Sequence, residues 1–224
     1  MGWSHGPAGL ARYRLTPNAF REQLRWLRSN GYHTIYSEEL RWFIDHREPF
    51  VGRPVMITFD DGFQDFADNA WPLLRDHDFT AEMFVVTDHV GGAAVWDAAY
   101  GTPTPLMDAA TIARLSIEGV HFGSHLAGHR AVDSLSTGEL AREMQRSRAA
   151  LAEWTGKAPA SVAAPFSITD RRFVPLAAEC GYRVAFGSRC GAAHLSDQAL
   201  DLPRIEVRGD MSIEAFAAAM EETR

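Results

Sequence analysis

The stretch Val55-Met56-Ile57-Thr58-Phe59-Asp60-Asp61-Gly62 joins an apolar, partly β-branched run to two adjacent carboxylates and a glycine. Such a run is typical of a strand buried on both faces, as in a parallel sheet covered by helices. In parallel α/β folds, active sites gather at the carboxyl ends of the strands. Adjacent carboxylates there repel each other, and a metal ion held by one of them relieves the repulsion. The alternative interpretation is an Asp-Gly turn with solvated charges.

Helical and strand patterns alternate on both sides of this stretch. The predicted helices span residues 17–29, 38–45 (with Ser37 as N-cap), 65–76, 108–116, 136–154, 171–180 and 213–221. The predicted strands span residues 33–36, 55–59, 83–87, 120–123, 161–164, 183–186 and 205–207. Strands separated by helices predict parallel pairing with crossover helices. About seven such units predict a single α/β domain over residues 1–224, built as a closed barrel or an open doubly wound sheet. No glycine-rich phosphate loop follows the first strand, which weighs against a nucleotide-binding version.

Two histidines follow another predicted strand, in Gly123-Ser124-His125-Leu126-Ala127-Gly128-His129. Imidazoles four residues apart converge on one ion in several zinc sites, although an isolated pair is often incidental. Two histidines and one carboxylate at strand ends make a set of three protein ligands. Such a set leaves coordination positions open for water and substrate, as in a catalytic site.

A third pattern, Ala163-Ala164-Pro165-Phe166-Ser167, also ends a predicted strand. The proline fixes the backbone, and the N–H of the next residue is then free to point into a site and stabilise an oxyanion. An ordinary strand-to-loop turn is the alternative. The long loop 91–105 is expected to form part of a site, and Trp96 in it could join Phe166 in an aromatic wall for a ligand.

Charge and composition limit the partners. The 224 residues carry a formal net charge of −7, and their basic side chains are scattered, so neither nucleic acid nor an anionic membrane is an expected partner. Cys180 and Cys190 are too few and too far apart for a disulfide framework or a Cys-x-x-Cys metal site. No apolar window approaches a membrane span, and the first residues lack a signal-peptide pattern, so a cytoplasmic protein is expected.

These motifs, in this order and spacing, resemble those of the polysaccharide deacetylase family, the nodulation-protein-B homology group of the carbohydrate esterase type. Thr58-Phe59-Asp60-Asp61-Gly62 and His125-x-x-x-His129 are similar to the two central motifs of that family. The resemblance extends over roughly residues 12–207 and includes Leu202-Pro203-Arg204-Ile205 near its end.

The resemblance implies a distorted (β/α) barrel that removes an acetyl group from an N-acetylated amino sugar. It implies that Asp61, His125 and His129 bind a divalent metal, commonly Zn²⁺. It further implies that Asp60 is the general base and that the amide N–H of Phe166 helps to hold the oxyanion.

The chain also departs from the family pattern. Many members carry an arginine that orients the catalytic aspartate, at the position of Ala163. Ala164 and Ser167 stand where a known branch of the family has tyrosine and glycine. His194 lies in about the right region for the family's late histidine, which serves as general acid, and a loop histidine without function is the alternative. Only Trp3-Ser4-His5 corresponds to the family's opening strand. The expected substrate is therefore a polysaccharide, a small glycoside or another N-acyl compound, and the oligomeric state stays open.

Three further classes remain open at this stage. Relatives of this fold open cyclic amides, so an amidohydrolase of a non-sugar amide is one alternative. A non-haem Fe(II) oxygenase also uses two histidines and a carboxylate, but usually on an antiparallel scaffold, which the alternating pattern argues against. The altered proline motif also allows a descendant that binds a ligand without turning it over.

Overall fold

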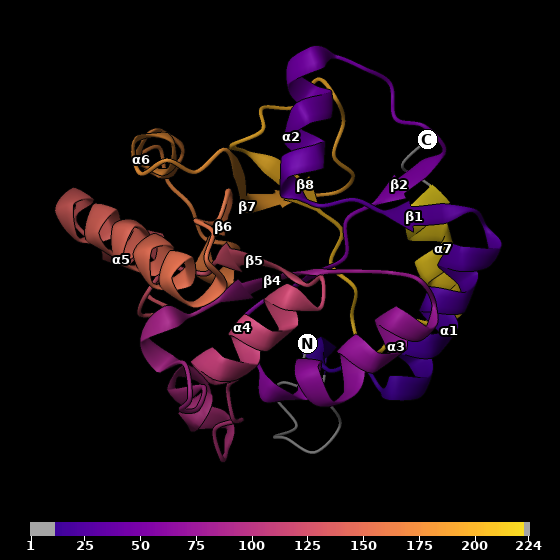
Figure 1. The fold of residues 1–224 in the computed structure, drawn as a ribbon, viewed down its shortest axis with the longest axis horizontal. Helices are drawn as coiled ribbons and strands as arrows, with labels where there is room; N and C mark the ends of the chain where they lie inside the picture. Colours follow the sequence, from indigo (N-terminus) through magenta and orange to yellow (C-terminus); the bar gives the residue numbers. More distant parts are fainter. Residues whose placement is uncertain (1–11, 222–224) are drawn as a thin grey trace.

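The computed structural model describes residues 12–221, and its centre is a curled sheet of six parallel strands (Figure 1). The strands follow one another in chain order: β3 (Thr58–Phe59), β4 (Glu82–Val85), β5 (His121–Ser124), β6 (Ser161–Ala163), β7 (Val184–Cys190) and β8 (Leu202–Arg204). Two more parallel strands, β1 (Tyr32–Thr34) and β2 (Arg53–Val55), pair with each other in a small second sheet. A doubly wound sheet reverses its strand order at one point, whereas the order of this sheet does not reverse. The predicted α/β fold of the distorted (β/α) barrel type is confirmed, with eight strands in the described residues rather than about seven.

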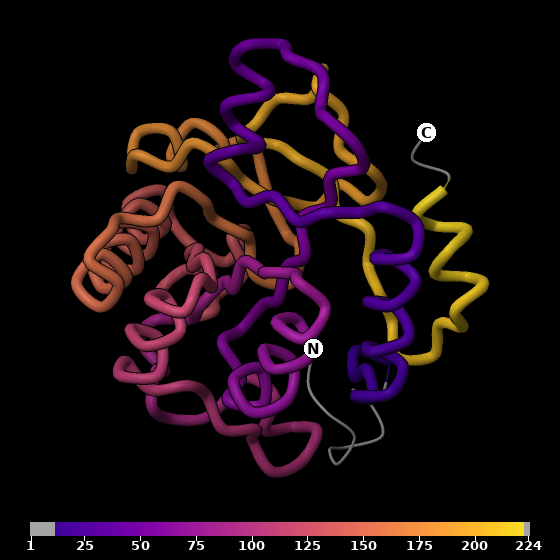
Figure 2. The backbone as a smooth tube through the Cα atoms, turned by 45° about the vertical axis from the view of Figure 1, so that its right-hand side comes forward, coloured from indigo at the N-terminus to yellow at the C-terminus, as the bar shows by residue number. Residues whose placement is uncertain are grey.

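Helices connect the strands and lie around them (Figure 1). Between successive strands of the large sheet lie α3 (Trp71–Asp76), α4 (Ala109–Ile117), α5 (Thr137–Thr155) and α6 (Phe173–Glu179), while α2 (Ser37–His46) connects β1 to β2. Figure 2 shows α1 (Pro17–Ser29) beside α7 (Ile213–Glu221). The rings of Trp26 and Phe216 meet edge to face there, 5.7 Å apart, and join the two ends of the described chain. None of the helices in residues 12–221 is long and apolar enough to cross a lipid bilayer.

Apolar periodicity explains which faces are buried. Phe20, Leu24 and Leu27 recur at helical spacing on α1 and are at most 5% exposed. In the centre of the sheet, every residue of β4 and of β6 is buried. Burying each large apolar side chain contributes about 1.5–3 kcal/mol, so these rows hold the curled sheet to its surrounding helices.

Several predicted boundaries were wrong, each for a local reason. The predicted strand 55–59 divides between the two sheets, because Val55 pairs with Thr34 while Thr58 pairs with Glu82. Helix 65–76 contains a π-helix, Phe66–Ala70, that continues without a break as α3, and Pro72 lies just after this π-turn, where the hydrogen-bond pattern already departs from the regular α-helix that proline interrupts.

Ser37 is the first residue of α2 rather than its N-cap, which is Tyr36. The Ser37 hydroxyl and N–H instead donate to the buried carboxylate of Glu82, at 2.8 and 3.0 Å. Burial raises the pKa of Glu82, although the hydrogen bonds from Ser161 and Ser37 oppose the shift. Ser37 thus satisfies a buried carboxylate at the amino end of β4 instead of capping a helix.

The final strand was predicted at residues 205–207, but β8 is Leu202–Arg204, which shifts Arg204 to the carboxyl end of a strand. The suggested opening strand Trp3-Ser4-His5 lies outside the described residues.

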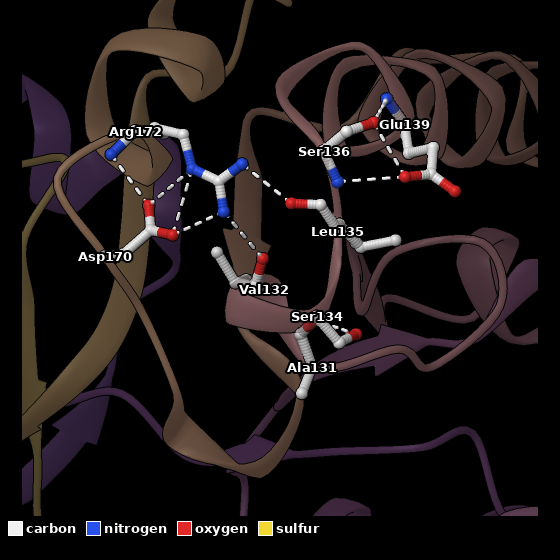
Figure 3. A network of polar contacts seen from close by, with 8 residues as sticks. All are labelled: Ala131, Val132, Ser134, Leu135, Ser136, Glu139, Asp170 and Arg172. Atoms are coloured by element: carbon white, nitrogen blue, oxygen red, sulfur yellow. Dashed lines mark hydrogen bonds and ion pairs between the residues drawn. The ribbon is translucent and has the colours of Figure 1, made fainter.

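The longest helix, α5, has the predicted capping box and ends at Gly156, whose φ is 73°. The Ser136 N–H donates to the Glu139 carboxylate at 2.9 Å, and the Ser136 Oγ accepts from the Glu139 N–H at 3.3 Å. Figure 3 shows how Arg172 ties the segment before α5 to the start of α6: its guanidinium donates to the carbonyls of Val132 and Leu135 and pairs with Asp170. These contacts join the 3-10 turn just before α5 to the segment that leads into α6.

Candidate active site

The carboxyl ends of the strands bring the chemically important residues together. Asp60 and Asp61 directly follow β3, and His125 directly follows β5. Phe166 follows β6, and Arg204 is the last residue of β8. Because all six strands are parallel, these carboxyl ends lie along the same edge of the curled sheet.

Asp61, His125 and His129 converge on one point. The Asp61 Oδ1 lies 3.5 Å from the His125 Nε2 and 3.1 Å from the His129 Nε2. Candidate ligand atoms of the three residues all lie within 4.8 Å of one another, and this is the one such cluster of histidine, cysteine and carboxylate groups found in residues 12–221. The structure therefore brings together the three predicted ligands.

The chemistry of these donors fits a divalent cation. The His125 Nδ1 donates to the Ala163 carbonyl at 2.9 Å, which leaves its Nε2 with a lone pair directed toward Asp61. Burial lowers the pKa of His125, although Asp60 and Asp61 oppose the shift, so its imidazole is neutral, the form that binds metal. The buried Asp61 Oδ1 has no hydrogen-bond partner in the described residues. An acceptor oxygen beside the lone pair of the His125 Nε2 needs a positive charge between them.

Strained backbone is concentrated in the same three loops. Of seven non-glycine residues with positive φ among those described, five lie here: Asp61, Leu126, His129, Phe166 and Ser167. Such conformations each cost about 1–3 kcal/mol and are typical of functional sites. The three loops are therefore held in shape by their surroundings rather than by local preference.

Ser167 provides a direct test of this strain. Its φ is 54°, a left-handed value that glycine adopts without a steric penalty. We expect Ser167→Gly to stabilise the protein by about 0.5–1 kcal/mol, because relief of left-handed strain exceeds the added entropy of the unfolded chain. Urea denaturation would measure the change. Ser196→Gly, at an exposed position without positive φ, is the control and is expected to destabilise slightly; equal effects of the two changes would contradict the strain argument.

Arg204 contacts Asp60 and supplies an arginine to this carboxylate, although the position of Ala163 lacks one. The guanidinium donates from Nη1 and Nη2 to the two oxygens of Asp60, each at 2.8 Å. Its Nη1 also lies 3.3 Å from the Thr58 Oγ1, and the guanidinium packs against the adjoining rings of Phe84 and Phe186, whose centroids lie 5.6 and 5.5 Å from its central carbon. A planar bidentate arginine packed against aromatic rings has little freedom, so it fixes the direction of the carboxylate.

The same contact controls the charge of Asp60. Burial alone would raise the pKa of Asp60, but the charge and hydrogen bonds of Arg204, with a contribution from His125, hold that pKa well below its usual range. Asp60 is therefore ionised at neutral pH, which is the form that can accept a proton. Asp60 and Asp61 are adjacent but differ in environment: one faces an arginine and the other faces two histidines.

Aromatic rings flank one of the histidines. The His129 ring lies 4.2 Å from the Trp96 ring and 4.5 Å from the Phe166 ring. Phe166 is 56% exposed, so part of its ring is available to a ligand. Trp96 reaches the site from the 3-10 turn Val95–Tyr100, within the loop 91–105 that was expected to form part of a site.

Two other ionisable residues, His194 and Asp97, lie outside the cluster of Asp61, His125 and His129. His194 is exposed on the loop after β7, and its backbone N–H donates to the Asp197 carboxylate at 2.7 Å. Within residues 12–221, no hydrogen bond, ion pair or ring contact links its imidazole to the ligands or to Asp60. Asp97, which sequence reasoning missed, lies next to Trp96; burial and the charge of Asp61 raise its pKa. No motif marked Asp97, because its place depends on the fold of the long loop.

Comparison with known proteins agrees with this geometry. Residues 47–185 match the family model described as polysaccharide deacetylase. The chain belongs to the polysaccharide deacetylase family. The matched range contains Asp60, Asp61, His125, His129 and Phe166, whereas Arg204 lies beyond it.

Curated relatives in the polysaccharide deacetylase family come from several bacteria. YxkH of Bacillus subtilis (strain 168) is 23% identical over 94% of this chain and 72% of its own length. The poly-beta-1,6-N-acetyl-D-glucosamine N-deacetylase of Staphylococcus epidermidis is 34% identical, over 38% of this chain and 29% of that protein.

Solved structures support the fold. The Streptococcus pyogenes deacetylase PplD, solved in complex with acetate, is 24% identical and superimposes with a TM-score of 0.82, over 94% of this chain and 89% of that one. IcaB of Ammonifex degensii is 23% identical, with a TM-score of 0.80, over 94% of this chain and 91% of that one. At this level of identity the structures show that the chain has the fold of these deacetylases.

Proposed function

We propose that this member of the polysaccharide deacetylase family is a metal-dependent hydrolase that removes the acetyl group from an N-acetylated amino sugar. The convergence of Asp61, His125 and His129 on one point, with the ionised Asp60 beside them, carries the proposal. A divalent cation, most commonly Zn²⁺ with this donor set, would supply Lewis acidity that polarises the amide carbonyl and makes water acidic enough to attack at neutral pH.

Each residue has a separate role in the proposal. Asp61, His125 and His129 would hold the cation, and the Ala163 carbonyl keeps His125 in the tautomer that binds it. Asp60 takes the proton from the attacking water, and Arg204 keeps its carboxylate oriented. The Phe166 N–H donates to the oxyanion of the tetrahedral intermediate. His194 stays the sequence-based prediction for the acid that protonates the leaving amine.

The proposed substrate class is a chain or oligomer of N-acetylglucosamine. The Staphylococcus epidermidis relative is named for its action on poly-beta-1,6-N-acetyl-D-glucosamine, which makes β-1,6-linked oligomers the first substrates to test. The exposed Phe166 ring beside His129 offers an apolar surface on which a sugar ring can stack.

The deciding experiment measures acetate released from β-1,6- and β-1,4-linked N-acetylglucosamine oligomers, and from small N-acetyl amides, with and without a chelator. We expect release from a sugar oligomer that falls to the background rate with chelator and returns when Zn²⁺ is added. Acetate release from the small non-sugar N-acetyl amides alone would instead support the amidohydrolase. Zn²⁺ binding without release from any substrate would point to a non-catalytic descendant.

A further inference from the structure

The three residues between the two histidines form a turn whose amide groups are all held by side chains. The Leu126 N–H donates to the Ser124 Oγ at 3.1 Å. The N–H groups of Ala127 and Gly128 both donate to one oxygen of Glu143, the Oε2, at 3.0 and 2.6 Å. On the carbonyl side, the backbone oxygens of Leu126 and Ala127 accept from the N–H groups of Thr87 and Asp88. The turn 126–128 is therefore fixed on both sides.

One face of α5 supports these N–H groups, directly through Glu143 and indirectly through Ser147. Glu143 and Ser147 are four residues apart on this helix, so they lie on the same face, and they are 8% and 0% exposed. The Ser124 hydroxyl, which accepts from Leu126, donates in turn to the Ser147 Oγ at 2.7 Å. The capped helix α5 thus holds the turn directly through Glu143 and indirectly through Ser147, which accepts from Ser124.

The turn needs this support because its backbone is strained. Leu126 and His129 have φ values of 60° and 53°, in a region that side chains other than glycine disfavour. Without the Glu143 oxygen, two largely buried N–H groups would lose their acceptor, at a cost of about 1–3 kcal/mol each. The backbone would then rotate to find other partners, and the direction of His129 would change with it.

We propose that Glu143 is a positioning residue for the metal centre: it fixes the turn 126–128 so that the Nε2 atoms of His125 and His129 converge on Asp61. The inference rests on the proposed function, because it assigns Glu143 a role toward the same cation. Glu143 acts through the geometry of the turn, and the acceptor oxygen is the part of the side chain that matters.

Two conservative variants separate reach from charge. Glu143→Gln keeps a carbonyl oxygen at the same reach and loses the charge, whereas Glu143→Asp keeps the charge and withdraws the carboxylate by one methylene. The readout is the Zn²⁺ Kd, measured on the whole protein by competition with a chromophoric chelator. We expect Glu143→Gln to remain within about threefold of wild type and Glu143→Asp to bind about 10–100-fold more weakly.

Glu82 provides the matched control. It is also a buried glutamate that accepts from a backbone N–H, but it lies at the amino end of β4, away from the ligands. Glu82→Gln and Glu82→Asp are expected to lower the thermal stability of the metal-free protein without changing the Zn²⁺ Kd.

The outcomes are distinct. A Glu143→Asp protein that binds Zn²⁺ like wild type, or a Glu143→Gln protein that binds more weakly than Glu143→Asp, overturns the positioning role. Wild-type protein that fails to bind Zn²⁺ at all contradicts the proposed function itself. Equal weakening by the Glu143 and Glu82 variants would assign the effect to general stability and also overturn the role.

Discussion

Asp60→Asn is expected to lower kcat for acetate release by about 10²–10⁴-fold while the protein still binds one Zn²⁺ with wild-type affinity. The amide cannot accept the proton from water, yet it is not one of the three converging ligands, because the Asp60 oxygens face Arg204. Steady-state kinetics together with metal analysis of the same preparation would measure both effects.

His125→Ala gives the complementary result. It removes one of the three donors, so Zn²⁺ content and activity are expected to fall together.

Asp45→Asn is a matched control for Asp60→Asn, because Asp45 also pairs with an arginine, Arg41, but on α2. It is expected to retain wild-type kcat. Full activity of Asp60→Asn would show that the general base is another group.

Arg204→Lys is expected to lower kcat by about 10²-fold, because a lysine ammonium cannot bond both carboxylate oxygens and leaves Asp60 free to turn. With the bidentate bonds gone and burial unchanged, the pKa of Asp60 rises. The reaction needs the ionised carboxylate, so activity is lost as pH falls through that pKa. The acid limb of the pH profile is therefore expected to lie at higher pH in the variant than in wild type.

Arg204→Met extends the test to stability. The folded-state pKa of Asp60 is depressed in wild type, so the ion pair stabilises the protein above the unfolded-state pKa of about 3.9, and this contribution is lost as pH falls through the folded-state pKa. Removing the arginine is expected to cost about 3 kcal/mol at pH 7, the low end for a buried pair because Asp60 is partly exposed. Urea denaturation at pH 7 and pH 3 should show a smaller loss at pH 3. Arg41→Lys, which leaves the site untouched, is the control for both variants, and an unchanged acid limb in Arg204→Lys would contradict the orienting role.

Local sequence was enough for the ligand set. Each of the three ligands follows the end of a strand closely: Asp61 comes after β3, and His125 and His129 come after β5. The carboxyl ends of parallel strands meet along one edge of a sheet. Their convergence therefore follows from the order of the elements, without any long-range detail. Their role toward a metal stays a prediction that the Zn²⁺ measurements test.

Arg204 was placed in the sequence only as part of Leu202-Pro203-Arg204-Ile205, and its contact with Asp60 was missed because the predicted strand lay three residues too late. A strand at residues 205–207 places Arg204 at its amino end, on the opposite side of the sheet from the site. In the structure, β8 ends at Arg204, so this residue lies at the carboxyl-end edge of the sheet, beside Asp60. Its partner lies 144 residues earlier, and the two meet only because the sheet curls until its last strand approaches its first. No local pattern records that curvature.

Side-chain hydrogen bonds explain the other differences. Ser37 has the residue type of an N-cap, but the buried Glu82 carboxylate accepts its hydroxyl proton. Glu143 lies in the middle of an unremarkable amphipathic helix, and only the packing of α5 against the turn 126–128 gives it a specific task. A single sequence ranks such residues by type, whereas their partners depend on the fold.

The contact between Arg204 and Asp60 also determines the order in which the parts of the site can form during translation. Asp60 leaves the ribosome 144 residues before its arginine. The three converging ligands and α5 precede Arg204 as well, so a nascent chain could assemble the metal centre before its base is oriented. Hydrolytic competence would then be acquired late in translation, when β8 pairs with β7 and brings Arg204 to Asp60. A polypeptide that stalls or is cleaved between residues 190 and 203 would keep its ligands and leave Asp60 without its counter-charge.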